Sequence, residues 1–239
     1  VYKRQGPDSG HVKVYGFDGN DWVQLGADID GEASGDNSGW SGSLSDDGNI
    51  VAIGANGNDG ANGTDSGHVK VYEYDGMSWT QLGDDIDGEA IDDESGYSVS
   101  LSSNGKIVAI GAPNNDGVNG PDSGHVKVYG FDGMSWTQLG DDIDGEAMTD
   151  LSGASVSLSS DGEIVAIGAR FNDDNGTNSG HVKVYEYDGT NWVQIGADID
   201  GVGVGDNSGF SVSLSSDGKI VAIGAHFNDD NGVDSGHVR

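Results

Sequence analysis

Pairs of aspartates separated by one residue are the clearest candidates for chemistry in this sequence. Each pair stands in an Asp-Ile-Asp-Gly motif that occurs four times. The pairs are Asp28 and Asp30, Asp85 and Asp87, Asp142 and Asp144, and Asp198 and Asp200. Two carboxylates before a glycine can begin an oxygen-rich cage for Ca²⁺, although that ion takes about six to eight oxygen ligands. These eight aspartates are the predicted metal ligands, and solvated acidic turns are the competing interpretation.

Histidine and tryptophan also recur at fixed positions. A histidine follows Ser-Gly five times, at His11, His68, His125, His181 and His237. No two of them lie at the spacing of a zinc motif, so packing or a hydrogen bond to a neighbouring loop is the favoured role. A Trp-x-Gln motif begins at Trp22, Trp79, Trp136 and Trp192. These indoles could stack on sugars, but aromatic packing between neighbouring sheets is the simpler interpretation.

The carboxylates do not form the pattern of an active site. They recur in nearly the same arrangement along the chain, whereas catalysis needs a unique set of groups with separated pKa values. The sequence shows no Ser-His-Asp arrangement, phosphate-binding loop or nucleophile elbow. We therefore predict no catalytic residues, no cofactor other than Ca²⁺, and a protein that is not an enzyme.

A repeat of 56–57 residues positions these groups, as the glycines of Ser-Gly-His show. They are Gly10, Gly67, Gly124, Gly180 and Gly236, which delimit four repeats. Each repeat predicts four strands and no helix. The first two form a hairpin at residues 41–55, 98–112, 155–169 and 211–225, the third covers 11–15, 68–72, 125–129 and 181–185, and the fourth begins at each Trp-x-Gln motif. Repeated four-stranded antiparallel sheets predict an all-β fold, a β-propeller.

The hairpin prediction depends on local patterns that are clear at residues 211–225. Val212 and Leu214 alternate with serines, which is the period of a half-buried strand. The apolar run at 220–223 is typical of a strand that is buried on both faces. Asp217 and Gly218 between them favour a tight turn, because aspartate bonds its own backbone and glycine accepts positive φ.

Glycine pairs in these hairpins carry a family resemblance. The first strands begin at Gly39-Trp40, Gly96-Tyr97, Gly153-Ala154 and Gly209-Phe210, and the second strands end in Gly-Ala at Gly54, Gly111, Gly168 and Gly224. In both landmarks and in spacing the chain resembles the FG-GAP repeat family, whose repeats form the blades of the integrin α-chain propeller. The resemblance implies an extracellular propeller of about seven blades, used for adhesion or ligand binding and often holding Ca²⁺.

One loop departs from the family's pattern. Integrin-type blades that bind Ca²⁺ carry Asp-x-Asp-x-Asp-Gly in the first hairpin. Here the corresponding residues are Asp46-Asp47-Gly48, Ser103-Asn104-Gly105, Ser160-Asp161-Gly162 and Ser216-Asp217-Gly218. One or two carboxylates do not supply the ligands that Ca²⁺ needs.

The phase of the repeats predicts the blade boundaries. Three complete blades are expected at about residues 40–83, 97–140 and 154–196, and a fourth is split between 210–239 and 8–26, which would close a four-bladed ring. The alternative is a fragment of a larger propeller from bulk metagenomic sequence. Residues 1–5 then form a non-native leader, and 6–239 are a single propeller domain or part of one. Open blade edges in such a fragment would invite self-association.

Charge and composition exclude some classes of binding partner. The chain has 41 acidic and 10 basic residues, a formal net charge of −31, and no cysteine. Such a charge repels nucleic acids and anionic lipids. The sequence has no apolar run long enough to insert in a membrane, and it does not open with a signal peptide. The absence of cysteine gives no disulfide framework from which to infer a compartment.

The acidic residues concentrate in two kinds of long loop. Antiparallel connectivity places the loops between second and third strands, and those between fourth and first strands, on one rim. Most of the 41 acids fall there. We therefore predict a non-enzymatic extracellular or cell-surface binding or adhesion module, with a protein or carbohydrate ligand on this acidic face and assistance from Ca²⁺. An accessory propeller of a larger secreted enzyme and a structural surface-layer repeat are the alternatives.

Overall fold

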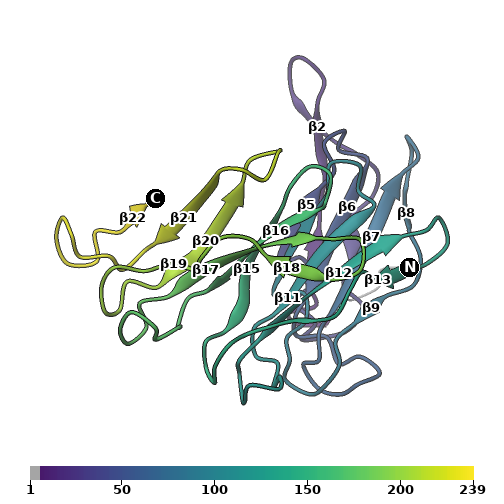
Figure 1. Ribbon diagram of the computed structural model, residues 1–239. Coiled ribbons are helices and arrows are strands. Elements are labelled where there is room, and N and C mark those ends of the chain that lie inside the picture. The colour runs from purple at the N-terminus through teal and green to yellow at the C-terminus, as the bar shows by residue number, and fades with distance from the viewer. Residues whose placement is uncertain (1–5) are drawn as a thin grey trace.

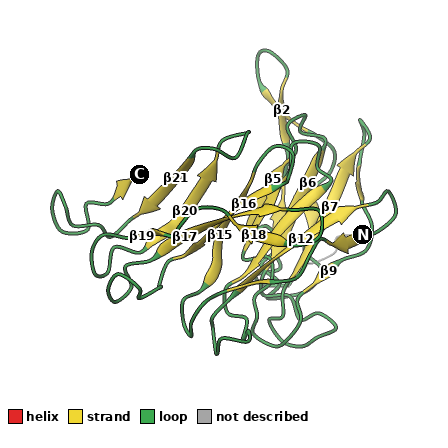
Figure 2. Cartoon of the chain, in the orientation of Figure 1, coloured by secondary structure: helices red, strands yellow, loops and turns green. Residues whose placement is uncertain are grey.

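Strands joined by loops make up the whole of the described chain. The computed structural model describes residues 6–239, and no helix occurs among them (Figure 2). The expected all-β class is confirmed. No described helix is therefore long and apolar enough to span a bilayer. The interpretation of residues 1–5 as a leader lies outside the described residues.

Three five-stranded antiparallel sheets follow one another along the chain (Figure 1). The first contains β5 (Ser41–Leu44), β6 (Ile50–Ala55), β7 (His68–Tyr74), β8 (Trp79–Gln81) and β9 (Ile86–Asp87). The second contains β10 (Ser98–Leu101), β11 (Ile107–Ala112), β12 (His125–Phe131), β13 (Trp136–Gln138) and β14 (Ile143–Asp144). The third contains β15 (Ser152–Leu158), β16 (Ile164–Ala169), β17 (His181–Tyr187), β18 (Trp192–Gln194) and β19 (Ile199–Asp200). The predicted hairpins and third strands are present in each.

The fourth strand differs from its prediction, because it is split in two. β8 pairs with the second half of β7, with Tyr72 opposite Gln81. β9 pairs with the first half, with His68 opposite Asp87. The Asp-Ile-Asp-Gly motif was predicted to be loop, and this is wrong for its Ile-Asp half. Ile86 is 6% exposed and joins the core beside β7, so burial of one side chain extends the sheet.

The ends of the chain form smaller sheets. β1 (His11–Val12) pairs with β4 (Ile29–Asp30), and β2 (Tyr15–Phe17) pairs with β3 (Trp22–Gln24). β20 (Ser208–Leu214), β21 (Val221–Ala225) and β22 (His237–Val238) form a third small sheet.

The expected split blade is not formed among the described residues. β21 pairs with β20 on one side and with β22 on the other. In the second of these pairings Ala225 lies opposite His237, just as Ala112 lies opposite His125 in the second sheet. β22 thus takes the third-strand position, and the strands β1 to β4 lie in another part of the molecule (Figure 1). The four-bladed closure expected from the repeat phase is therefore wrong for this structure.

Consecutive sheets pack through apolar side chains and close backbone contacts. Val69 and Val71 of β7 share a core with Val108 and Ile110 of β11. Backbone approach is closest at the glycine landmarks. A Cβ atom on Gly111 would lie 2.0 Å from the carbonyl oxygen of Gly153 in the next sheet. Glycine is therefore required where one sheet meets the next, and apolar burial supplies the main driving force.

Candidate functional site: the paired loops

Two loops of each repeat lie side by side. In the first sheet they are residues 56–67, between β6 and β7, and residues 88–97, between β9 and β10; we call these the paired loops. The backbone N–H groups of Asp92, Glu94 and Ser95 donate to the carbonyl oxygens of residues 64–66 at 3.0 to 3.1 Å. The second sheet has the same arrangement at residues 113–124 and 145–151, and the third at 170–180 and 201–207. Backbone hydrogen bonds therefore fix the two loops to one another.

The glycine of Asp-Ile-Asp-Gly brings each aspartate pair against these loops. A Cβ atom on Gly145 would lie 1.9 Å from the carbonyl oxygen of Ser123, and one on Gly88 would meet Ser66 at the same distance. This motif glycine therefore permits a close backbone approach. The consequence is that Asp144 lies beside the loop that contains Ser123.

The first aspartate of each pair belongs to a charge cluster around a buried lysine. Lys127 Nζ lies 3.5 Å from Asp142 Oδ2 and also contacts Glu89, which comes from the preceding repeat. Gln138 donates a 2.7 Å hydrogen bond to Asp142. Burial alone would lower the pKa of Lys127, but Glu89, Tyr129 and Asp142 outweigh this effect and raise it. The ammonium group therefore stays charged.

The same cluster recurs at the other repeat boundaries. Lys70 contacts Glu32 and lies 3.2 Å from Asp85, and Lys183 contacts Glu146 and lies 3.5 Å from Asp198. In the first repeat Lys13 lies 3.3 Å from Asp28. A protein cation thus already compensates the first carboxylate of every pair.

Buried histidines complete these clusters. Their members lie within 4.8 Å of one another and are Glu32, His68 and Asp85; Glu89, His125 and Asp142; and Glu146, Asp174, His181 and Asp198. Burial, and then the neighbouring lysine, lower the pKa of His68, His125 and His181. These nitrogen and oxygen sets could ligate a metal ion, but the lysine ammonium would repel a divalent cation there. Sequence reasoning missed the glutamates and lysines, which come from different repeats.

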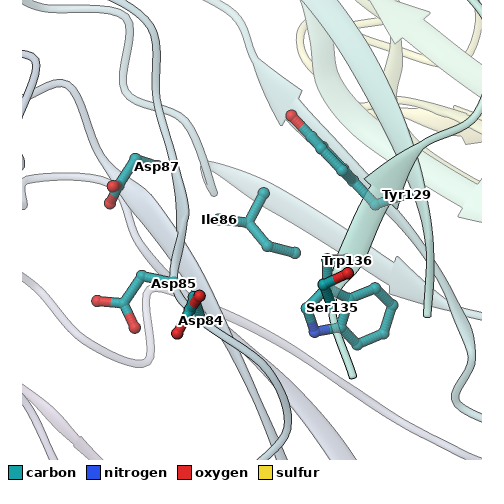
Figure 3. Close-up of a pocket in the computed structure, with 7 residues that line it drawn as sticks. All are labelled: Asp84, Asp85, Ile86, Asp87, Tyr129, Ser135 and Trp136. Carbon is teal, nitrogen blue, oxygen red and sulfur yellow. The ribbon is translucent and has the colours of Figure 1, made fainter. Parts of the chain in front are cut away.

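The second aspartate of a pair faces different neighbours. Figure 3 shows Asp85 and Asp87 on the side of the chain away from Ile86, which points toward Trp136 and Tyr129. Asp87 lies near Asn58 in the paired loops. Burial, and then the charge of Asp142, raise the pKa of the corresponding Asp144. The two aspartates of each predicted pair therefore have different neighbours. The first belongs to the lysine cluster, and the second lies beside the paired loops.

The aspartate pairs of the first and last Asp-Ile-Asp-Gly motifs also have neighbours within their own sheets. Asp198 accepts a 2.6 Å hydrogen bond from Gln194 in the third sheet. Asp200 ends β19 and pairs with His181. Asp30 ends β4 and pairs with His11 of β1. In every pair the first aspartate directly precedes the short Ile-Asp strand, and the second ends it.

The predicted tryptophan face contributes contacts between sheets. Trp136 Nε1 donates a 2.8 Å hydrogen bond to the carbonyl oxygen of Leu82 in the preceding sheet. Asp84 to Asp87, Tyr129, Ser135 and Trp136 line a cavity of about 200 Å³ at this boundary (Figure 3). Because the indole N–H is already bonded, this tryptophan connects neighbouring sheets, as the packing interpretation predicts.

Some acidic residues in the loops are buried rather than facing solvent. Asp93 is 2% exposed; it accepts hydrogen bonds from the backbone of Ala90 at 3.0 Å and from the amide of Asn115 at 2.9 Å. Asp36, Asp150 and Asp206 are also buried. These carboxylates hold the paired loops in place, a role that the sequence pattern alone does not distinguish from ligand binding.

Antiparallel sheets that repeat along the chain and pack face to face define a blade-type β-repeat protein. Within it, residues 143–185, which run from β14 through β17, match the family model of the FG-GAP repeat. The resemblance in the glycine landmarks is thereby confirmed. FG-GAP repeats commonly form extracellular adhesion or binding modules. A search of curated proteins finds no match to the chain.

Proposed function

We propose that this chain is part of a non-enzymatic, extracellular β-propeller that binds a protein or carbohydrate ligand through its acidic loop face. By acidic loop face we mean the solvent-facing carboxylates of the paired loops. The observation that carries the proposal is the backbone hydrogen bonding between the two loops of each repeat. It holds acidic residues from two separate stretches of sequence next to one another on a scaffold of packed sheets, which supports a shared binding surface.

Charge defines the kind of ligand. Asp59, Asp92 and Asp116 are exposed in the paired loops, and the formal net charge of the chain is −31. Such a surface accelerates encounter with a ligand that presents basic groups, or that binds through bridging cations. It also opposes nucleic acids and anionic lipids, which carry the same sign of charge.

Repetition favours binding over catalysis. The lysine-centred clusters have nearly the same geometry at three successive boundaries, from Lys70 to Lys183. An active site uses one set of residues whose pKa values differ in a functional way. A surface made of similar units is instead suited to a ligand that contacts several repeats at once.

The test is binding to immobilised secreted proteins and extracellular glycans at increasing salt. A variant with Asp59, Asp92 and Asp116 changed to asparagine should weaken binding at least about tenfold, or about 1.4 kcal/mol. The matched control changes Asp75, Asp132 and Asp188 to asparagine. These are acids of the third-to-fourth-strand hairpins that only close their turns. Equal loss in both variants would contradict the proposal, and regular self-assembly without ligand binding would favour a surface-layer repeat.

A further inference from the structure

Two buried serine hydroxyls have no hydrogen-bond partner among residues 6–239. Ser66 and Ser123 occupy equivalent places in the paired loops of the first and second sheets. Both are 0% exposed, and neither Oγ atom makes a hydrogen bond. A buried hydroxyl without a partner is costly and rare in folded proteins. Each therefore calls for an explanation from its surroundings.

Both hydroxyls face a small space that is bordered by other oxygen atoms. From the position of a Cβ atom on Gly60, Ser66 Oγ lies at 3.2 Å, Asn58 Oδ1 at 3.3 Å and Asp87 Oδ1 at 3.5 Å. Because Gly60 has no side chain, that space remains free of protein atoms.

The second sheet repeats this geometry with different residues. From the same position on Gly117, Ser123 Oγ lies at 2.9 Å, Asp144 Oδ1 at 3.4 Å and Asn115 Oδ1 at 3.5 Å. The side-chain amide nitrogen of Asn115 donates to Asp93 at 2.9 Å, so its carbonyl oxygen remains available. Three side-chain oxygens thus border one space in each of two sheets.

The third repeat shows how the same residues behave in a loop that is one residue shorter. Asp174 stands in place of Gly60-Ala61 and Gly117-Val118, and its backbone N–H donates to Asn172 Oδ1 at 3.0 Å. Ser179, the counterpart of Ser66, is bonded to the carbonyl oxygen of Asn172 at 3.3 Å. The last repeat follows the third, because Asp230 donates to Asn228 and Ser235 Oγ has the same bond at 3.1 Å. The unpartnered hydroxyl therefore occurs together with glycine.

The chemistry of the bordering atoms selects a hard cation. A hydroxyl, an amide carbonyl and a carboxylate are oxygen donors, with no sulfur and no histidine nitrogen among them. Asp36 and Asp59 line the same cavity as Asp87, and its volume is about 510 Å³. His68 and the two carboxylates that Lys70 compensates, Glu32 and Asp85, also border this cavity. The nearest lysine cluster uses Asp85, which leaves Asp87 free of any ion pair among the described residues. Oxygen ligands with excess negative charge suit Ca²⁺, and water can supply its remaining ligands.

We propose that the paired loops of the first and second sheets each bind one Ca²⁺ ion, through Asn58, Ser66 and Asp87 and through Asn115, Ser123 and Asp144. These sites differ from the first-hairpin loops, and they use only the second aspartate of each Asp-Ile-Asp-Gly motif. The third sheet has no such site, because Asn172 Oδ1 and Ser179 Oγ already form hydrogen bonds within their own loop. The inference does not depend on the ligand proposed above, since Ca²⁺ can bind whether or not the acidic loop face engages a partner.

Calorimetric titration of the full chain with CaCl₂ tests the number and the position of the sites. The protein should bind two Ca²⁺ ions, Asp87→Asn and Asp144→Asn should each lose one, and the double variant should lose both. The matched control is Asp200→Asn, which changes the equivalent carboxylate of the third sheet and should retain two. Absence of Ca²⁺ binding, or equal loss in Asp200→Asn, would overturn the inference. A failure to adhere to any ligand would not bear on it.

Melting curves of serine variants give a second readout. In CaCl₂ the wild type should melt at a higher temperature than in NaCl of matched ionic strength, and Ser66→Ala with Ser123→Ala should remove most of that difference. Without Ca²⁺ the same double variant should be at least as stable as the wild type, because it removes two unpartnered hydroxyls. Ser179→Ala should keep the full Ca²⁺ effect. Identical wild-type melting curves in CaCl₂ and NaCl would show that only water or screening ions occupy the spaces beside Ser66 and Ser123.

Discussion

Replacement of Gly111 by alanine tests whether close approach between sheets explains the Gly-Ala landmark. Its added Cβ would lie 2.0 Å from the carbonyl oxygen of Gly153 and 2.4 Å from Ser98 Oγ. Ser98 already uses that oxygen to donate a 2.7 Å hydrogen bond to the carbonyl of Gly153. The methyl group can be accommodated only if the third sheet moves away from the second or this hydrogen bond breaks.

Two opposing contributions determine how much Gly111→Ala changes the free energy of unfolding. Alanine in a strand gains about 0.5–1 kcal/mol over glycine from the lower entropy of its unfolded chain. Overpacking costs about 1–3 kcal/mol, and the upper end applies here because the obstacle is backbone, which cannot change rotamer. A cost of about 3 kcal/mol less a gain of up to about 1 leaves a net loss of about 2 kcal/mol. For a chain of this length that is a fall of roughly 4–8 °C in melting temperature, at about 2–4 °C per kcal/mol.

Gly224→Ala is the matched control, because Gly224 occupies the same position in the terminal sheet. Its Cβ would meet Ser211 Oγ at 2.4 Å, and the backbone carbonyl oxygen of Ser211 lies 3.8 Å away. A serine side chain can rotate, so the melting temperature should change by less than about 2 °C, which corresponds to less than about 1 kcal/mol. Thermal unfolding followed by far-ultraviolet circular dichroism measures both. Equal shifts in the two variants would refute the role assigned to sheet contact.

Three further predictions follow from the buried charges and the terminal sheets. Lys127→Met should cost about 1–3 kcal/mol, measured by urea unfolding, because its two carboxylate partners lose their cation; Lys219→Met, at an exposed lysine, should cost nothing measurable. Burial lowers the pKa of His125 in the folded chain below its usual 6.5. The unfolded chain therefore takes up a proton at this imidazole before the folded chain does, and the free energy of unfolding decreases as the pH falls below about 6.5. His125→Gln should therefore lose less stability than the wild type between about pH 7 and pH 5, and an equal loss in the two proteins would contradict this. Finally, light scattering should show association that increases with concentration, because β20 and β21 expose apolar side chains that inner sheets bury; a strictly monomeric chain would contradict this.

The sequence predicts the strands better than the site, because strand signals are local. The alternation of Val212 and Leu214 and the turn at Asp217-Gly218 identify a hairpin without reference to the rest of the chain. Ile86–Asp87 is too short to carry such a signal. It becomes a strand only because Val69 is close enough to pair with Ile86.

The site could be predicted only in part, since its members come together across repeats. Glu32 and Lys70 are 38 residues apart and belong to different repeats, so no motif links them. The Ca²⁺ inference also needed the structure, because the Asp-Ile-Asp-Gly pattern alone places Asp85 and Asp87 in one site. A usable signal was present in the alignment of the repeats, where the single residue Asp174 takes the place of Gly60-Ala61.

The buried lysines of this chain lie at the sheet boundaries rather than in the loops. Lys70, Lys127 and Lys183 are each buried between a glutamate of one repeat and an aspartate of the next, so they neutralise the boundaries where the sheets pack. With only 10 basic residues against 41 acidic ones, few remain for the loops. Carboxylates that lack a protein cation repel one another, and this repulsion is relieved by bound ions or by a basic partner. A cation beside Gly60 and another beside Gly117 would neutralise carboxylates of the paired loops, as the lysines neutralise those at the sheet boundaries.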